Sequence, residues 1–501
     1  MKPLAGLRLI DLSTVVAGPY SGALLADLGA DVIKVEPPAG DAARGLVTEE
    51  GLAPHVHTNQ RNKRGMVIDL KHPAGKAAFH DLVRWADVVL ENYRPGVTER
   101  LGIDYPALAA LNPRIVMCSI TGYGLTGPGR DRAAFDANIQ AYAGVMGLTG
   151  EPDGRPVRAA LAYADLCAGM AGALGILAAV VARDRTGRGQ HVDLAMFDVQ
   201  LSMQNYFCTM QLASARPPRR LGNEHELHVP YNAYPTASGP LFVTVVTEAQ
   251  WSGLLRALGR LDHPPEVRPH LQMLADARLR SRGIRIAARD AINAALEAIL
   301  ATRPREEWMA ALAAERMPFA PVNTLAEALA DPQAVARGML PRIPLPDGGT
   351  RPASGNPIKL SDAGPDTFTP PPKLGQHTRE VLADVLGYDE DRVARLLASG
   401  AFTAAAHYPA PGYGPRAGGG ARPGAAEKGD AHGTTDSRTD CEAATRCEPA
   451  ARGAGSRSEA AANRGAVTRN DPTAGAGGAA SSAAAPRAAT GPGAASPGAE
   501  G

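Results

Sequence analysis

Short apolar runs alternate with longer segments of helix-forming residues through the first part of the chain. Residues 7–12, 31–36, 65–70, 87–91 and 114–120 have the composition of buried strands. Helix signals fill several of the intervals between them, and a helix that follows a strand and precedes another strand forms a βαβ unit. The pattern therefore predicts an α/β fold that is built on a parallel sheet.

The longest apolar segment, residues 157–183, contains a single carboxylate, Asp165, where an extended run meets a run of helix formers. Gly169, Gly172 and Gly175 recur every three residues, which predicts a helix face that permits close backbone packing. The segment is about long enough to cross a bilayer, but it is rich in Ala and Gly and has charged residues at both ends. A buried core helix is therefore the preferred interpretation.

Asp165 has two interpretations that the local sequence leaves open. Aspartate is a common helix N-cap, because its carboxylate accepts hydrogen bonds from the backbone N–H groups of the first turn. The same position in an apolar wall would keep a carboxylate poorly hydrated, which favours attack on an activated carbonyl. A cap is the more frequent role for such a residue, and a nucleophile is the more specific one.

The pattern changes from about residue 208, where the strands become fewer and amphipathic helices dominate. The predicted elements there are a strand at 241–246 and helices at 250–259, 280–302 and 305–315. We expect a large α/β domain that begins with residues 1–207, a smaller α+β domain at 208–325, and a further segment at 326–402 that leads out of the smaller domain. That further segment reads as a strand pair at 342–360 with a turn at 355–357, then a last helix that starts at 373–378.

Residues 403–501 consist mainly of Ala, Gly, Pro, Ser, Arg and Thr, and this low-complexity composition predicts a disordered tail.

Overall composition excludes several classes of function. A formal net charge of +1 and an aromatic content of 5% give no support for binding to nucleic acid or to an acidic membrane surface. The five cysteines are far apart and form neither a metal spacing nor a disulfide framework. The N-terminus lacks the apolar region of a signal peptide, so we expect a cytoplasmic protein. His225 and His228 flank a Glu-Leu pair, but their spacing is one residue short of the metalloprotease motif, so no metal site is predicted.

Loops that follow parallel strands collect at one edge of the sheet, where ligands bind. Here they carry Val16, Asn92, Tyr93 and the glycine-rich segment 121–128. That segment matches Gly-x-Gly-x-x-Gly, but Pro128 opposes a helix at that point, so a surface loop is a better interpretation than a dinucleotide site. Several cations lie near this edge and would suit a multiply phosphorylated ligand. They are Arg61, Lys63, Arg64, Lys71, Arg94 and Arg100.

A set of short motifs in a fixed order gives the most specific signal. The motifs are Ala17-Gly-Pro19, residues 29–37 (GADVIKVEP), Asn62-Lys-Arg64, residues 87–96 (DVVLENYRPG), Asn112-Pro-Arg114, residues 186–190 (TGRGQ), Ala320-Pro-Val322 and residues 374–378 (LGQHT). With them, residues 4–396 resemble the class III coenzyme A transferases, which include formyl-CoA transferases and a carnitine CoA-transferase.

The resemblance implies that Asp165 is the catalytic aspartate. It also implies contacts to coenzyme A from Val16, Ala17, Leu70, Lys71, Asn92, Tyr93 and Arg100. The family often places a lysine before an aromatic residue; Ala133 stands at the lysine position, so Arg130 or Arg132 can replace it beside Phe135. The implied fold is a large Rossmann-like, CoA-binding domain that is built from residues 1–207 and 326–402, with the small domain at 208–325 inserted between them. Coenzyme A and acyl-CoA would be substrates, with no tightly bound cofactor. The implied assembly is a homodimer whose two subunits are threaded through each other.

The implied reaction moves CoA from an acyl-CoA donor to a carboxylic acid through an aspartyl anhydride and an aspartyl-CoA thioester. Such an anhydride is reactive enough to exchange with a thioester, so neither ATP nor a metal is required. The alternative is an α-methylacyl-CoA racemase, which uses the same fold and pairs the aspartate with a histidine. Phe135 occupies the position of that histidine and cannot carry a proton.

Overall fold

A parallel sheet forms the centre of the first part of the chain. The computed structural model describes residues 2–49, 51–215 and 217–402, so the predicted tail lies outside the described residues. Within that range six parallel strands pair in the order β3-β2-β1-β4-β5-β6. They are β1 (Arg8–Asp11), β2 (Asp31–Glu36), β3 (Lys63–Val67), β4 (Val88–Glu91), β5 (Val116–Thr121) and β6 (His191–Ala195). This is the strand order of the Rossmann fold, and it confirms the predicted fold class.

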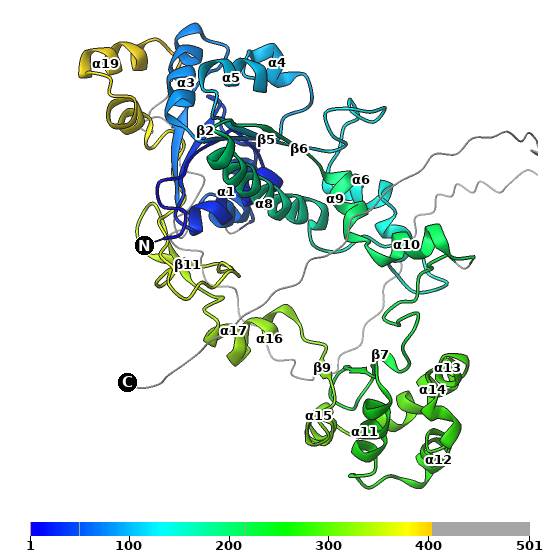
Figure 1. Ribbon diagram of the computed structural model, residues 1–501. Coiled ribbons are helices and arrows are strands. Elements are labelled where there is room, and N and C mark those ends of the chain that lie inside the picture. The colour runs from blue at the N-terminus through cyan, green and yellow to red at the C-terminus, as the bar shows by residue number, and fades with distance from the viewer. Residues whose placement is uncertain (1, 50, 216, 403–501) are drawn as a thin grey trace, which may run out of the picture. The chain divides into compact units, whose positions relative to one another are not determined.

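Helices cover both faces of this sheet (Figure 1). Alternate strand residues explain why: Leu9 and Val32 belong to one buried cluster, and the next residues, Ile10 and Ile33, belong to another. The first cluster is completed by α1 (Ala17–Asp27) and α8 (Tyr163–Thr186). The second is completed by α3 (Pro73–Trp85) and α5 (Tyr105–Leu111). Strands buried on both faces are expected in a parallel sheet.

Helix α8 packs closely on the sheet and on α1, as its glycines predicted. A Cβ on Gly169 would lie 2.7 Å from the carbonyl oxygen of Ala17, and one on Gly172 would lie 2.8 Å from Ile120 Cδ1. In the described part of the chain α8 is the one helix long and apolar enough to cross a membrane. Its buried residues face α1 and the sheet, as expected of a core helix, but its other side is exposed, with 39% of the apolar stretch buried.

A separate apolar cluster is built from residues 229–319. It contains an antiparallel sheet of β7 (Tyr231–Tyr234), β8 (Leu241–Thr244) and β9 (Phe319–Pro321), and it buries Trp251 and Trp308. The helices of this part are α11 (Glu248–Leu258), α12 (Arg268–Leu274), α13 (Arg282–Ala287), α14 (Arg289–Leu300) and α15 (Arg305–Ala314). The prediction of one long helix at 280–302 was wrong, because the helix is interrupted at Ala288, between α13 and α14. The domain boundaries stay a prediction.

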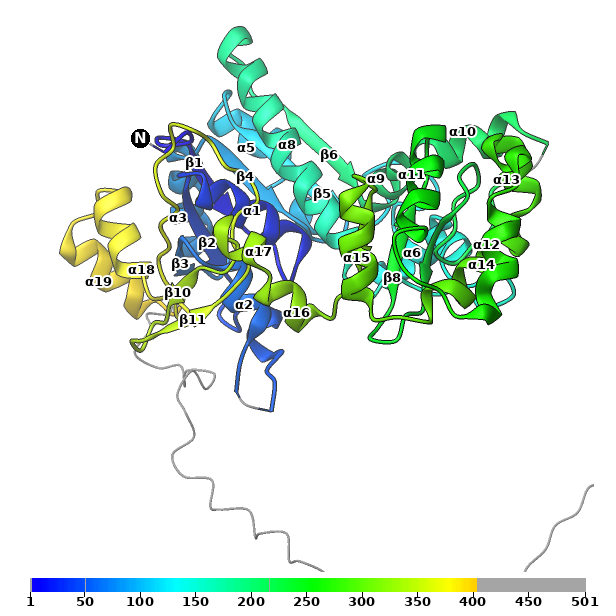
Figure 2. The same ribbon diagram turned by 90° about the horizontal axis from the view of Figure 1, so that it is seen from below.

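The last described segment returns to the first sheet (Figure 2). His377 donates its backbone N–H to Gly65 at 2.8 Å and accepts the N–H of Gly65 on Nδ1 at 2.9 Å, beside β3. Its helices are α18 (Thr378–Glu380) and α19 (Glu390–Ala398), with a π-helical turn at 381–385 between them. The strands β10 (Arg342–Pro344) and β11 (Thr350–Pro352) are joined through residues 345–349. In the turn expected at 355–357, the side-chain oxygen of Asn356 accepts the N–H of Ile358 at 2.8 Å.

The remaining helices are short and lie mostly in the connections. They are α2 (Pro54–Asn59), α4 (Val97–Leu101), α6 (Asp136–Tyr142), α7 (Val145–Leu148), α9 (Met196–Met203), α10 (Tyr206–Ala213), α16 (Leu325–Ala330) and α17 (Pro332–Ala336).

Candidate active site

A cavity of about 350 Å³ opens at the carboxyl edge of the sheet. Its wall is formed by the segments that follow β1, β4, β5 and β6, together with Asp165 from α8. In the sheet, β1 lies between β2 and β4. Strands β2 and β3 follow on one side of β1, and β4, β5 and β6 follow on the other side, so the strand order reverses at β1. The cavity lies at this point of reversal. Open α/β sheets bind their ligands at this point.

The structure brings most of the predicted site residues together. Those that line the cavity are Val16, Ala17, Asn92, Tyr93, Arg132, Phe135 and Asp165. Leu70 and Lys71 line a second cavity of about 170 Å³, and Tyr93 lies on the walls of both cavities. Arg100 lines neither; it belongs to α4, whose residues Val97 and Leu101 line the second cavity.

Asp165 occupies the first turn of α8, as the third residue of the helix. Its carboxylate does not cap the helix, and among the described residues we find no hydrogen bond to either carboxylate oxygen. Burial, together with the nearby charge of Asp136, raises the pKa of Asp165 to about 6. The result is a carboxylate that is ionised at neutral pH, poorly solvated and directed to a cavity, which are the properties of a nucleophile.

The cap of α8 comes from a residue that precedes the helix by almost thirty positions. Asp136 accepts the backbone N–H of Ala164 at 2.7 Å and that of Asp165 at 3.2 Å, both on Oδ1. Gln140, which is fully buried, donates to the other oxygen of Asp136 at 2.7 Å. The common interpretation of Asp165 as a simple helix cap is therefore wrong.

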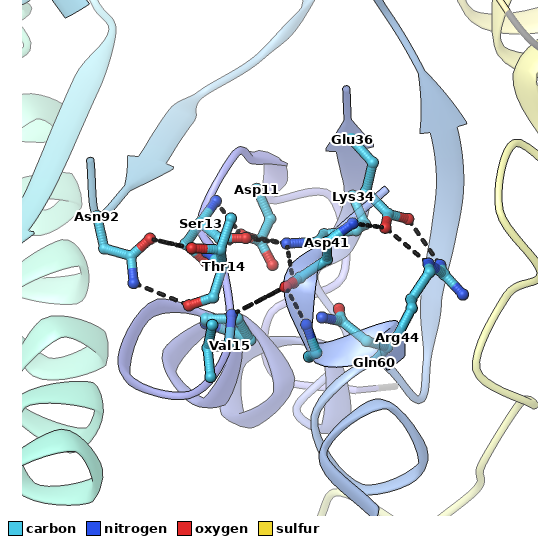
Figure 3. Close-up of polar contacts among 12 residues, drawn as sticks. Asp11, Ser13, Thr14, Val15, Lys34, Glu36, Asp41, Arg44, Gln60 and Asn92 are labelled. Carbon is cyan, nitrogen blue, oxygen red and sulfur yellow. Dashed lines mark hydrogen bonds and ion pairs between the residues drawn. The ribbon is translucent and has the colours of Figure 1, made fainter. Parts of the chain in front are cut away.

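The loop after β1 is held in a strained conformation beside the cavity (Figure 3). Val15 has φ +66°, a left-handed conformation that β-branched residues rarely adopt. The carboxylate of Asp41 accepts the N–H of Val15 at 3.2 Å. Asn92 accepts the N–H of Thr14 at 2.7 Å and donates to the Thr14 carbonyl at 2.9 Å. Asn92, a predicted coenzyme A contact, thus uses both polar atoms of its side chain to fix this loop.

A buried network of charges supports the same loop (Figure 3). Lys34 lies 3.3 Å from Asp41, and Lys63 donates to Asp11 at 2.8 Å. Asp11 in turn accepts the N–H of Ser13 at 2.9 Å. Burial opposes ionisation of Asp11, but the charges of Lys34 and Lys63 hold its pKa below the ordinary value. Burial likewise lowers the pKa of Lys63, to about 8.

Three of the predicted ligand-facing cations are structural instead. Lys63 is fully occupied in the buried network, Arg61 pairs with Asp27 at 2.7 Å, and Arg64 pairs with Asp31 at 2.6 Å. These three cations are therefore not available to a ligand. Sequence proximity to the edge does not show which way a side chain points. Lys71 and Arg94 do line cavities.

A second strand end fixes Tyr93. Glu91, at the end of β4, accepts the N–H of Tyr93 at 2.7 Å. Burial raises the pKa of Glu91 to about 7. Tyr93 is therefore held from its backbone at the boundary between the two cavities.

Arg132, on the cavity wall, lies against two tyrosine rings. The guanidinium of Arg132 lies 4.4 Å from the ring centroid of Tyr142 and 5.4 Å from that of Tyr123. Phe135 is 76% exposed although it lines the cavity. Stacking of this kind fixes the plane of a guanidinium while leaving its N–H groups available to an anion.

Within the described part of the chain no cluster of His, Cys, Asp and Glu has the arrangement of a metal site. His225 and His228 lie with ring centroids 4.6 Å apart, and Glu224 pairs with Arg289 rather than with them.

Sequence reasoning missed two residues that shape the site, Asp136 and Asp41. A signal for the first was present, because Ala162, Tyr163 and Ala164 at the start of α8 offer no capping side chain, so an acceptor must come from elsewhere. No comparable signal marks Asp41, since the left-handed conformation of Val15 cannot be read from the residue type.

The fold and the site define a Rossmann-type protein with a partly buried carboxylate that lines a cavity at the sheet edge. Residues 4–378 match the family described as CoA-transferase family III, and the chain belongs to that family of CoA-transferring enzymes.

Relatives and solved structures agree with this assignment. The chain is 38% identical to a succinate–glutarate CoA-transferase of Agrobacterium fabrum, over 76% of this chain and 96% of the relative. It is 36% identical to an acetyl-CoA:oxalate CoA-transferase of Acetobacter aceti, over 72% of this chain and 89% of the relative. The crystal structure of a CAIB/BAIF family protein from Brucella suis has 37% identity and a TM-score of 0.67, and covers 77% of this chain and 99% of that one.

Proposed function

We propose that this enzyme transfers CoA from an acyl-CoA to a carboxylic acid through covalent intermediates on Asp165. The observation that carries the proposal is the unpaired, half-buried carboxylate of Asp165 in a cavity at the topological switch point. A helix-capping carboxylate would be occupied by backbone N–H groups, and Asp165 is not.

The proposed chemistry exchanges carboxylate and thiolate at acyl carbons. A carboxylate oxygen of Asp165 attacks the thioester carbon of the donor, the C–S bond breaks and CoA leaves as thiolate, which gives a mixed anhydride. The thiolate then attacks the aspartyl carbon, the C–O bond to the donor acid breaks, and an aspartyl-CoA thioester forms. An acceptor carboxylate repeats the sequence in reverse, and Asp165 is regenerated as carboxylate. Electrons and atoms balance at each step without an external oxidant or reductant.

The two cavities suggest how coenzyme A is held. The proposed ligands near the reacting end are Val16, Ala17, Asn92, Arg132 and Phe135, and those near the distant end are Leu70, Lys71 and Arg100. Tyr93 is shared by both cavities, so a single extended molecule can contact both.

We propose small dicarboxylic acids as substrates. Relatives are named for succinate, glutarate and oxalate. Arg132 places positive charge on the wall that holds Asp165, whereas Arg130 on the same wall is paired with Asp131 at 3.0 Å. A guanidinium pairs well with the second carboxylate of such an acid. Monocarboxylates would lack this contact.

The racemase alternative requires a second acid–base group across the α-carbon. Phe135 stands at the expected histidine position, and among the described residues that line the cavity there is no histidine. Exchange of the α-proton into deuterated water without an acceptor acid would favour that alternative over the transferase.

Trapping the covalent intermediate tests the proposal directly. The enzyme is mixed with succinyl-CoA, then treated with hydroxylamine or borohydride, and Asp165 is examined by peptide mass spectrometry. We expect a hydroxamate or an alcohol at Asp165, and loss of both adduct and transfer in Asp165→Asn. The same reaction with glutarate, oxalate and acetate as acceptors measures the substrate class. Full transfer activity in Asp165→Asn would remove the proposal.

A further inference from the structure

Asp136 stands out as a partly buried carboxylate that touches the proposed nucleophile only through the backbone. It begins α6, it does not line the cavity, and its Oδ1 accepts the N–H groups of Ala164 and Asp165. Its second oxygen accepts a hydrogen bond from the side-chain amide nitrogen of Gln140. The side-chain amide oxygen of Gln140 accepts the N–H of Ala159 at 2.9 Å. Asp136 and Gln140 together therefore tie α6 to the segment that leads into α8.

The beginning of α8 creates a specific problem for a nucleophile. Free N–H groups at a helix start attract carboxylates, and an aspartate in the first turn is well placed to accept them itself. A carboxylate engaged in this way is stabilised and aimed at its own backbone rather than at a substrate. No side chain at Ala162, the N-cap position, meets this need.

We infer that Asp136 is a positioning residue for the transfer reaction: it takes the N–H groups that Asp165 would otherwise accept and leaves the Asp165 carboxylate directed to the cavity. Its negative charge also offsets the positive end of α8, which would otherwise stabilise the Asp165 carboxylate and weaken it as a nucleophile. This inference rests on the proposed function, because it assigns a purpose to a free Asp165.

Two substitutions separate the two effects of Asp136. Asp136→Asn keeps an oxygen that accepts from the backbone, removes the negative charge, and places its amide nitrogen where Gln140 now donates. Asp136→Ala removes both, so that the first-turn N–H groups can recruit Asp165. Exposed Asp153, which lies in the segment between α7 and α8, offers a matched control as Asp153→Asn.

The other charged or titratable groups near this end of α8 remain the same in every variant. They are Tyr93, Arg94, Arg130 and Arg132 on the cavity wall, Tyr20 on α1, Tyr163 and Cys167 on α8, and exposed Asp198 on α9. A change in the pH profile of an Asp136 variant therefore reports the loss of Asp136 itself.

The measurement is the rate at which the adduct on Asp165 forms in a single turnover, followed by rapid quench from pH 5 to 8. For Asp136→Asn we expect the acid limb of the pH–rate profile, where the rate falls as Asp165 is protonated, to move to lower pH by about 0.5 unit. The reason is that the negative charge of Asp136 near Asp165 has been removed. For Asp136→Ala we expect kcat to fall at least about tenfold with little change in the KM for acyl-CoA, because the nucleophile is misdirected rather than the binding site lost. Asp153→Asn should match the wild type.

A wild-type acid limb of the pH–rate profile in Asp136→Asn would overturn the charge effect, and a wild-type kcat in folded Asp136→Ala would overturn the positioning role. Where Asp136→Ala fails to fold, a wild-type acid limb together with a wild-type kcat in Asp136→Asn would overturn the inference. A kcat that falls only in proportion to the folded fraction, measured by circular dichroism, would also overturn it. Failure of the proposed function looks different: the wild type would then form no adduct on Asp165, and Asp165→Asn would still transfer CoA.

Discussion

At the scale of single residues, the site depends on which carboxylates are occupied and which are free. Asp11, Asp41 and Asp136 all accept hydrogen bonds from backbone N–H groups, and two of them also face lysines. Asp165 has no such partner among the described residues. The chain thus contains several buried acids near one edge, and their hydrogen bonds distinguish the structural acids from the reactive one.

Activity should depend on pH through Asp165. Burial raises the pKa of this group to about 6, and only its ionised form is a nucleophile. We therefore expect kcat/KM to fall about tenfold per pH unit below 6 and to level off above it. Initial rates in buffers of constant ionic strength measure this. A profile that stays flat down to pH 4.5 would contradict the assignment.

Arg132 provides a second test at this scale. Its guanidinium stacks on Tyr142 at the cavity rim and faces no acidic partner in the described chain. Arg132→Ala should raise the KM for acyl-CoA about tenfold or more, the value of one charge-assisted hydrogen bond, with a smaller effect on kcat. Arg395→Ala, an exposed arginine of α19, serves as control. If only the KM for the acceptor acid rises, Arg132 binds the acid and not coenzyme A.

At the scale of elements, the loop after β1 shows how strain is maintained. Residues held in sparsely populated backbone regions persist only where their surroundings fix them. Here Thr14 is fixed by Asn92 from β4, and Val15 is fixed by Asp41 from the segment after β2 (Figure 3). The loop shape therefore depends on the sheet order, which places β1 between β2 and β4.

Removing Asp41 should affect both stability and binding. Asp41→Ala leaves the N–H of Val15 without its acceptor and Lys34 with one fewer anionic partner in a fully buried position. We expect a loss of roughly 3 kcal/mol in the free energy of unfolding, as is typical when a buried ion pair is broken, together with a raised KM for acyl-CoA. Urea denaturation and initial rates measure the two effects.

Asp41→Asn is the matched variant, because it keeps an acceptor for Val15 but loses the charge that faces Lys34. It should lose stability while keeping a KM close to that of the wild type. If Asp41→Ala lowers stability without any change in KM, the loop does not depend on Asp41 for its shape.

The elements were predicted better from the sequence than the site. Residues 31–36 form a strand with the expected bounds, and the glycines of α8 pack as expected, because both patterns are local. Asp165 could be selected as the candidate catalytic residue because it is the single carboxylate in its apolar segment and because the ordered motifs resemble a known family. The capping by Asp136 and the ion pair of Lys63 with Asp11 could not, because they join residues that are distant in the sequence and depend on side-chain direction.

At the scale of the whole molecule, α8 has two different faces. One packs on α1 and the sheet, and the other leaves an exposed apolar row at Met170, Leu174 and Val181, with Leu174 at 70% exposure. These positions are four and seven residues apart, so they lie along one side of the helix. Exposed apolar surface of this kind marks a contact with another molecule. We propose that a second copy of the chain covers it, in the threaded homodimer that the family resemblance implies.

Placing a charge on this row tests the proposed assembly. Leu174→Glu should shift the protein from dimer to monomer at micromolar concentration, because burying an unpaired carboxylate in an apolar interface is unfavourable. Sedimentation velocity measures the change, and Ala394→Glu on the exposed side of α19 is the control.

Two results would contradict a dimer through α8: a wild-type chain that sediments as a monomer, or a Leu174→Glu variant that remains dimeric. Sedimentation of the wild type with anionic lipid vesicles, lost in Leu174→Glu, would instead assign the row to a membrane surface. Leu174 lies more than two helical turns beyond Asp165 on the same helix, so the two positions can be tested separately. The Asp165→Asn variant should remain a dimer. A folded Leu174→Glu monomer would show whether CoA transfer needs the second subunit.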